Sequence, residues 1–467
     1  MRFEGHIDVC RPDLVSGWAR DADAPGRALR LEAFIGRRRL GSLVAGEGRS
    51  DLAAAGLGNH GFRLRPPHRL SAAERDVLHF RAEDSEEGLF DAFGAVQPNP
   101  FVHPPPALQA EPRFRRCILH IGTEKTGTTS LQHFLALNRD ALMEQGIYVP
   151  QSLVPQGQKP MLNHSDLAAL ALADWRMADS LRHQRAIATA EDLAAFRSAS
   201  AAALEAELEA APAGCDTLLL SSEHCHSRVL LLHEVAALYA FLAPHATAHE
   251  VLVYLRPQHD LAMSQFGMQL LAGEAEAEML PPLPYPSGYA KPRTTDAAYF
   301  DYGRLLSRWA AIFGRAALRP VLFAEALRDG GDVIGDACRR IGIDATGMAL
   351  PPRLASNISA PAQRFLRSFL PVAKQRLGAD SDRVTGFVAE RLRRTAPGQG
   401  ELPPRDAVSR FMAQFAAGNE RVRTEWFPER GRLFDIDLAA FPTKAETHPL
   451  ESAEVFVLLA DLLAAER

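Results

Sequence analysis

One short stretch constrains the fold more than any other, because an apolar run passes through a glycine-rich loop into a helix. Residues 117–121 read Cys-Ile-Leu-His-Ile, which is typical of a buried parallel strand. Residues 122–130 form the loop, and residues 130–138 form the expected helix. Helix N-termini present unpaired N–H groups and a partial positive charge, and glycines let a backbone approach a ligand closely. This order therefore predicts an anion-binding site.

The remainder of the chain after this loop alternates strand-like and helical segments. Such alternation predicts an α/β domain, a three-layer P-loop-like parallel sheet flanked by helices. After Pro361 the sequence is rich in Ala and Arg and is expected to be mainly helical. The other predicted strands of the sheet span residues 217–220, 250–255 and 319–323.

The first 96 residues follow a different pattern, in which short alternating runs are separated by turn-forming residues. Strands at this spacing predict a small N-terminal β-sandwich, an accessory domain of residues 1–96. Prolines are dense in the next segment, so we expect a stiff linker at residues 97–113 and a second domain at residues 114–467. The predicted strands of the sandwich span residues 29–35, 39–44, 61–64 and 77–81.

Charge and cysteine content narrow the class of protein. The net charge of −5 argues against a general nucleic-acid-binding protein, which would be clearly basic. The five cysteines are scattered and lack CxxC spacing, which favours a reducing compartment. The N-terminus lacks the apolar region of a secretory signal, and the most apolar stretch, residues 229–244, is too short and too charged to span a bilayer. We therefore expect a cytoplasmic protein without a transmembrane segment.

The position of the lysine in the loop separates two kinds of phosphate site. The spacing Gly-x₄-Gly matches the start of a Walker A loop, but Thr128 stands where a Walker loop has its lysine. Lys125 lies inside the loop instead, where it would reach a single 5′-phosphate and its bridging oxygen. A P-loop kinase or NTPase, which also needs a Mg²⁺-binding Asp, is therefore the second candidate.

The loop resembles the 5′-phosphosulfate loop of sulfotransferases that use 3′-phosphoadenosine-5′-phosphosulfate (PAPS), whose core reads KTGTT. The resemblance implies that Lys125 neutralises charge on the leaving phosphate as the S–O bond breaks, an electrostatic effect that is often the largest in catalysis. It also implies a product, adenosine 3′,5′-bisphosphate (PAP). The residues that it assigns to the donor are Gly122, Thr123, Glu124, Lys125, Thr126, Gly127, Thr128, Thr129 and Ser130.

A second segment repeats the strand-to-helix order. Arg256 ends a predicted strand, where open α/β sheets bind ligands, and Ser264 follows eight residues later. Arginine offers paired donors to a phosphate. In sulfotransferases a strand-end Arg and a Ser at this spacing hold the 3′-phosphate of PAPS, so the resemblance extends to Arg256, Asp260 and Ser264.

The acceptor hydroxyl must lose a proton, and three residues are candidates for the general base. Glu223 follows the buried strand 217–220 through Ser221-Ser222, so it should emerge at the carboxyl edge of the sheet, facing the donor. Bacterial and carbohydrate sulfotransferases are similar here, with a Glu in this role. His164 and His226 are the alternative bases. His224 and His226 lack further ligands at zinc spacing, so we expect no metal.

The sequence thus predicts a PAPS-dependent sulfotransferase acting on a hydroxyl, with a saccharide or glycolipid as the favoured acceptor. A third hypothesis is a non-catalytic glycan-binding protein on the same fold. Gly17-Trp18-Ala19 resembles the mark of a small bacterial β-domain found beside glycan-modifying enzymes, and we expect Trp18 in the sandwich core. The identity of the acceptor and the oligomeric state stay open, and an oligomer is compatible with the sequence.

Overall fold

The computed structural model divides the chain into two compact units. One consists of Met1–Leu255 and Pro284–Ala349, and the other of Arg256–Leu283 and Leu350–Arg467. The linker expected at residues 97–113 lies mostly outside the described residues, so the predicted domain boundary stays a prediction. The structure describes residues 3–83, 88–91, 94–98, 111–155, 162–281, 297–352, 357–444 and 450–464.

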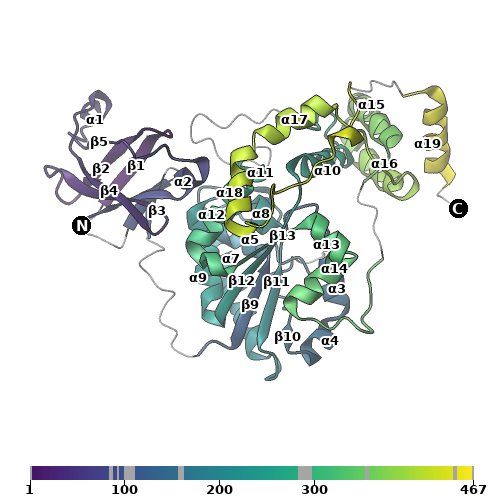
Figure 1. Cartoon of the computed structure of the whole chain (residues 1–467), viewed down its shortest axis with the longest axis horizontal. Helices are drawn as coiled ribbons and strands as arrows, with labels where there is room; N and C mark the ends of the chain where they lie inside the picture. The colour runs from purple at the N-terminus through teal and green to yellow at the C-terminus, as the bar shows by residue number, and fades with distance from the viewer. Residues whose placement is uncertain are drawn as a thin grey trace. The chain divides into compact units, whose positions relative to one another are not determined.

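The first unit is built around a five-stranded parallel sheet in the order β10-β11-β9-β12-β13 (Figure 1). Its central strand contains the apolar run identified in the sequence. Such a run is expected there, because a central parallel strand is covered on both faces. The predicted α/β fold class is therefore confirmed. The strands are β9 (Phe114–His120), β10 (Ile147–Tyr148), β11 (Thr217–Ser221), β12 (Ala246–Leu255) and β13 (Leu318–Leu322).

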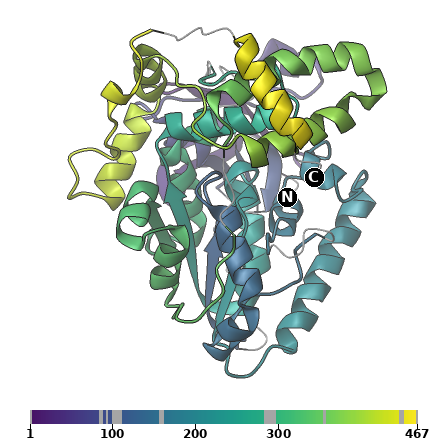
Figure 2. The same cartoon turned by 90° about the vertical axis from the view of Figure 1, so that its right-hand side faces the viewer.

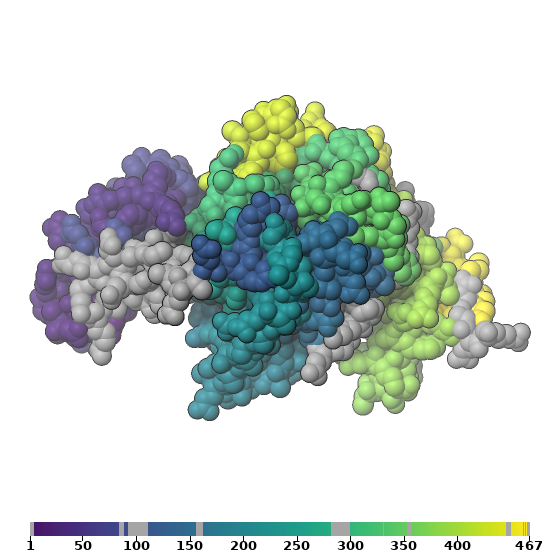
Figure 3. All heavy atoms as spheres, turned by 90° about the horizontal axis from the view of Figure 1, so that it is seen from below, coloured from purple at the N-terminus to yellow at the C-terminus, as the bar shows by residue number. Residues whose placement is uncertain are grey.

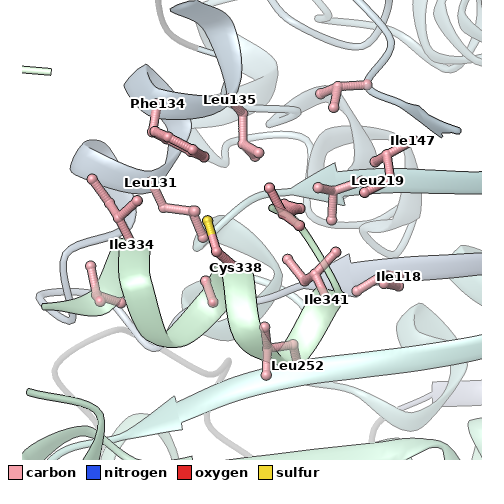
Figure 4. Close-up of a cluster of buried hydrophobic side chains, with 14 of the residues drawn as sticks. Ile118, Leu131, Phe134, Leu135, Ile147, Leu219, Leu252, Ile334, Cys338 and Ile341 are labelled. Atoms are coloured by element: carbon pink, nitrogen blue, oxygen red, sulfur yellow. The ribbon is translucent and has the colours of Figure 1, made fainter. Parts of the chain in front are cut away.

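Helices cover both faces of this sheet. On one face, Leu131 and Phe134 of α3 pack with Ile334 of α14 against Ile118 and Leu252 of the sheet (Figure 4). On the other face lie α9 and α12 (Figure 1), while Figure 2 looks onto the face covered by α3, drawn in blue. The helices of this unit are α3 (Thr128–Leu137), α4 (Arg139–Glu144), α5 (Asp166–Ala171), α6 (Ser180–His183), α7 (Ala190–Glu209), α8 (His224–Ser227), α9 (Leu232–Leu242), α11 (Ala297–Phe300), α12 (Tyr302–Phe313), α13 (Phe323–Gly330) and α14 (Val333–Ile341).

The N-terminal residues of the same unit form two antiparallel sheets, as the sequence predicts. Their order is β1-β2-β5 and β4-β3-β6-β7-β8. Figure 3 shows the packed side chains of this region in purple. Two predicted strands, 29–35 and 61–64, have the observed bounds. The elements are β1 (Phe3–Cys10), β2 (Val15–Asp21), β3 (Leu29–Ile35), β4 (Arg38–Ala45), α1 (Ser50–Ala54), β5 (Gly61–Leu64), α2 (Ala72–Asp76), β6 (Leu78–Ala82), β7 (Gly88–Asp91) and β8 (Gly94–Pro98).

A single apolar core joins the two N-terminal sheets into a sandwich. Phe62 of β5 packs on Phe80 of β6, with ring centroids 4.9 Å apart. The expectation that Trp18 lies in this core is wrong. In β2 the buried positions are taken by Val15, Gly17 and Ala19, and Trp18 lies half-buried on the opposite face. Position 17 has no room for a side chain, because a Cβ there would overlap the carbonyl oxygen of His6 and lie 2.9 Å from the Phe62 ring.

An ion-pair cluster links the sandwich to α12. Asp76, at the end of α2, is 3% exposed. Its Oδ2 accepts hydrogen bonds of 2.6 Å from Arg304 Nε and 2.6 Å from Arg308 Nη1. Arg308 is itself 1% exposed, so removal of the carboxylate would leave a buried guanidinium without its counter-charge.

The second unit is helical. Its core contains Phe266 and Leu270 of α10, Leu366 of α15 and Leu392 of α16. None of the helices in the described part of the whole chain is both long and apolar enough to cross a membrane. The helices of this unit are α10 (Gln258–Leu271), α15 (Ala360–Leu377), α16 (Ser381–Thr395), α17 (Arg405–Ala413), α18 (Ala416–Trp426) and α19 (Ser452–Ala464).

Candidate active site

The glycine-rich loop joins the central strand β9 to the N-terminus of α3. Gly127 is the N-cap residue of α3 at φ +79°, and Gly122 has φ +92°. Glycine adopts these left-handed conformations without the strain that a Cβ introduces. A Cβ at Gly127 would also lie 2.6 Å from Cγ1 of Val333, which packs beside the loop. No side chain caps α3, so the first N–H groups of the helix are not bound by the N-cap residue.

Two threonines hold the loop in shape. The Thr123 hydroxyl donates to the carbonyl oxygen of Tyr254 at 3.0 Å, and the Thr126 hydroxyl donates to the carbonyl oxygen of Thr123 at 2.7 Å. Both side chains are fully buried. Lys125 lies between them in the sequence, half-buried and at φ +62°. Thr129, at the start of α3, is exposed. The loop is therefore a fixed turn that presents Lys125 and the start of α3.

Glu223 lies beside this loop, at the carboxyl end of the sheet. It follows β11 and precedes α8. A Cβ added at Gly122 would lie only 3.2 Å from the Cβ of Glu223. Two amides hold its carboxylate: Gln132 Nε2 donates to Oε2 at 2.6 Å, and Asn163 Nδ2 donates to Oε1 at 3.0 Å. Asn163 is fixed in turn by the Ser222 hydroxyl, 3.0 Å from its Oδ1. The two amides therefore hold the carboxylate from both oxygens.

His164 is fully buried beside Ser221, the last residue of β11 and two residues before Glu223. The Ser221 N–H donates to His164 Nδ1 at 3.1 Å, and His164 Nε2 donates to the carbonyl oxygen of Pro150 at 2.9 Å. Burial lowers the pKa of His164, although both backbone contacts oppose this change. Both ring nitrogens are therefore bound to the backbone, and His164 joins the segment after β10 to the end of β11.

A second polar group consists of His226, which is buried, and Glu124, a half-buried residue of the loop. His226 Nε2 donates to the carbonyl oxygen of Tyr299 at 3.1 Å, and the two rings have centroids 4.7 Å apart. Burial lowers the pKa of His226 to about 4, so the ring is neutral at pH 7. The Tyr299 hydroxyl donates to Glu124 Oε2 at 2.7 Å. The carboxylate of Glu124 is thus bound by a tyrosine of α11.

Three side chains at this site, Gln132, Asn163 and Tyr299, were not predicted as site residues from the sequence. Gln132 is polar and fully buried on α3, one turn after Thr128 and among apolar neighbours. A buried polar residue so close to a phosphate loop is a usable signal, because buried amides need partners. Asn163 and Tyr299 carry no comparable signal in the sequence. Their contacts form only because segments distant in the sequence pack at this edge of the sheet.

Arg256 and Ser264 belong to the second unit. Arg256 follows β12 directly and its Nε lies 3.9 Å from Oδ2 of Asp260, while Ser264 is half-buried on α10. On the same helix, Gln258 Nε2 donates to Asn419 Oδ1 of α18 at 2.7 Å. The assignment of Arg256 and Ser264 to a 3′-phosphate stays a prediction from their spacing.

Among the residues that the structure describes, no three His, Cys, Asp or Glu side chains form a group that could hold a metal ion.

Neither a family model nor a curated protein matches the chain. Two solved structures show a partial likeness. A sulfotransferase from Alicyclobacillus acidocaldarius is 19% identical over 58% of this chain and 95% of that one, with a TM-score of 0.30. A sulfotransferase domain from the curacin biosynthetic pathway is 11% identical over 50% of this chain and 76% of that one, with a TM-score of 0.27. These TM-scores are too low for either match to support a function.

Proposed function

We propose that the chain is a sulfotransferase that moves a sulfuryl group from PAPS to an acceptor hydroxyl. The observation that carries this proposal is the support of Glu223 by Gln132. Gln132 lies on α3, the helix that begins at the phosphate loop, and its amide donates to the Glu223 carboxylate at 2.6 Å. One helix thereby supports both a candidate base and a candidate phosphate cradle, and group transfer depends on such fixed positioning.

In the proposed reaction, the acceptor oxygen attacks sulfur while the bond from sulfur to the 5′-phosphate oxygen breaks. The electron pair of that bond stays on the phosphate of the departing PAP. Lys125 and the first N–H groups of α3 stabilise this charge, because cations and helix N-termini favour anions. Glu223 accepts the proton of the acceptor hydroxyl. No metal ion is required at any of these steps.

Glu223 is preferred to both histidines as the base in this proposal. The two ring nitrogens of His164 are each engaged by backbone groups, at 3.1 Å and 2.9 Å. His226 donates to a backbone carbonyl and is kept neutral by burial, which lowers its pKa to about 4. A ring whose conjugate acid is so weak is a poor proton acceptor at pH 7.

The remaining parts of the proposal rest on the sequence. Arg256 and Ser264 are assigned to the 3′-phosphate by their spacing alone. A saccharide or glycolipid acceptor and a cytoplasmic location are likewise sequence predictions.

Titration calorimetry with PAP tests the donor site without knowledge of the acceptor. We expect the wild-type chain to bind PAP at least about tenfold more tightly than ATP. A lost hydrogen bond to a charged group is worth about 1.5–3 kcal/mol, so Lys125→Ala should weaken PAP binding about 10- to 100-fold. Lys374→Ala, on the exposed side of α15, is the matched control and should bind PAP normally. Equal affinity for ATP, or normal PAP binding by Lys125→Ala, would falsify the proposal.

A further inference from the structure

The outer face of the β1-β2-β5 sheet carries a partly exposed tryptophan that the proposed reaction does not use. Trp18 lies in the middle strand, and the strand register sets its neighbours. His6 of β1 is directly opposite on one side, and Gly61 of β5 on the other. Directly opposite residues share one face of a sheet, so His6 and Trp18 both face outward, and Gly61 adds no side chain beside the indole.

Ion pairs lie on both sides of Trp18 along the strand. Two residues further along β2, Arg20 faces outward as well. Arg20 is paired with Glu4 of β1, with Nη2 2.7 Å and Nε 2.8 Å from the Glu4 Oε2 atom. Planar, paired groups of this kind offer several donors and acceptors in a fixed geometry.

Arg49 supplies the second ion pair. Its aliphatic chain lies over Gly61, where a Cβ would be 2.8 Å from Arg49 Cδ. Its guanidinium forms ion pairs with Asp8 of β1 and with Asp51. Because β2 lies between β5 and β1, Arg49 crosses the middle strand on the face that carries Trp18. The indole is therefore bordered by two arginine–carboxylate pairs.

We propose that this surface, the Trp18 face (Trp18, His6, Arg20, Glu4, Arg49 and Asp8), binds an uncharged saccharide. The C–H face of a sugar ring is apolar and stacks on an aromatic ring, while its rim of hydroxyls needs donors and acceptors at the edge. The two arginines and the carboxylates that pair with them supply both.

The balance of charge on the Trp18 face selects among ligands. Each arginine is matched by at least one carboxylate, Glu4 for Arg20 and Asp8 for Arg49, so the face has no excess positive charge for a polyanion. All four side chains are partly exposed, so their carboxylate oxygens and guanidinium N–H groups can meet a ligand at the rim of the indole. This inference concerns binding only and holds whether or not the chain transfers a sulfuryl group.

The test uses the full-length chain on an array of immobilised neutral and acidic oligosaccharides. We expect retention on at least one neutral saccharide and no preference for acidic ones. That saccharide is then used in solution titrations. Trp18→Ala should bind it at least about tenfold more weakly, and Trp18→Phe, which keeps an aromatic face, should lose less.

Two controls separate loss of the face from loss of the fold. Trp175→Ala removes another partly exposed tryptophan, 40% exposed, and should bind the saccharide normally. Arg20→Gln keeps the indole but breaks the ion pair with Glu4, and should weaken binding as well. All variants should bind PAP like the wild type. The inference is refuted if no neutral saccharide is retained, or if Trp18→Ala and Arg20→Gln both bind as tightly as the wild type.

Discussion

The substitution Gly127→Ala tests whether the phosphate loop has the shape described here. Two independent penalties are expected. An L-residue at φ +79° is disfavoured by about 1–2 kcal/mol. The new Cβ would also lie 2.6 Å from Cγ1 of Val333, which is 5% exposed and cannot turn away, and such overpacking costs about 1–3 kcal/mol. The free energy of unfolding should therefore fall by about 2–5 kcal/mol.

Two further variants separate the penalties in urea unfolding experiments. Gly342, the C-cap residue of α14, has the same left-handed conformation with φ +91° and no atom within 4 Å of a Cβ, so Gly342→Ala should show the backbone penalty alone. In a Val333→Ala background, Gly127→Ala should be milder by about 1 kcal/mol or more, because the overlap with Val333 is gone. If Gly127→Ala is no more destabilising than Gly342→Ala, or is equally destabilising in both backgrounds, the contact between Gly127 and Val333 is not formed.

Three other predictions address the base, the ion-pair cluster and a buried histidine. Glu223→Gln should lower kcat about 10²- to 10⁴-fold, measured with labelled PAPS and a mixed saccharide acceptor, and leave PAP affinity unchanged. Asp76→Ala should lower the free energy of unfolding by about 3–5 kcal/mol in urea, because Arg308 stays buried without its counter-charge. As pH falls from 6.5 to about 4, unfolded His226 takes up a proton that the folded chain excludes, so stability falls by about 3 kcal/mol. His226→Gln should remove that part of the pH dependence, and an unchanged slope would contradict it.

The parts of the fold that depend on local pattern were predictable from the sequence. Strand β9 and its loop could be found because an apolar run, two glycines and a helix start lie within about twenty residues, and the bounds of β3 and β5 follow from alternation and turn residues. Trp18 was expected in the core because small sandwiches usually bury a tryptophan. The alternation of β2 instead places Val15, Gly17 and Ala19 inward, and a Cβ at Gly17 would overlap the neighbouring strand.

Gln132 and Asn163, the two residues that hold Glu223, could not be predicted as its partners from local sequence pattern. Glu223 could be proposed because a strand end predicts the position of the next side chain. Its partners could not, since Gln132 is 91 residues away and Asn163 is 60 residues away in the sequence. They meet at Glu223 because β11 lies between β9, which precedes Gln132, and β10, which precedes Asn163, and this strand order is not encoded in any single segment.

Glu124 presents a conflict that the tertiary structure resolves, since a carboxylate inside a phosphate loop would repel its ligand. Burial by itself would raise the pKa of Glu124, but hydrogen bonds from Ser227 and Tyr299 hold the pKa below its usual value, so the group is ionised at pH 7. The Tyr299 hydroxyl, 2.7 Å from Oε2, binds this charge. Tyr299→Phe should therefore weaken PAP binding about tenfold in titration calorimetry, because the released carboxylate opposes the phosphate. Adding Glu124→Gln should restore the affinity, since an amide does not repel an anion. If the double variant binds PAP no better than Tyr299→Phe alone, the charge of Glu124 is not what Tyr299 controls, and its role in the loop would be packing alone.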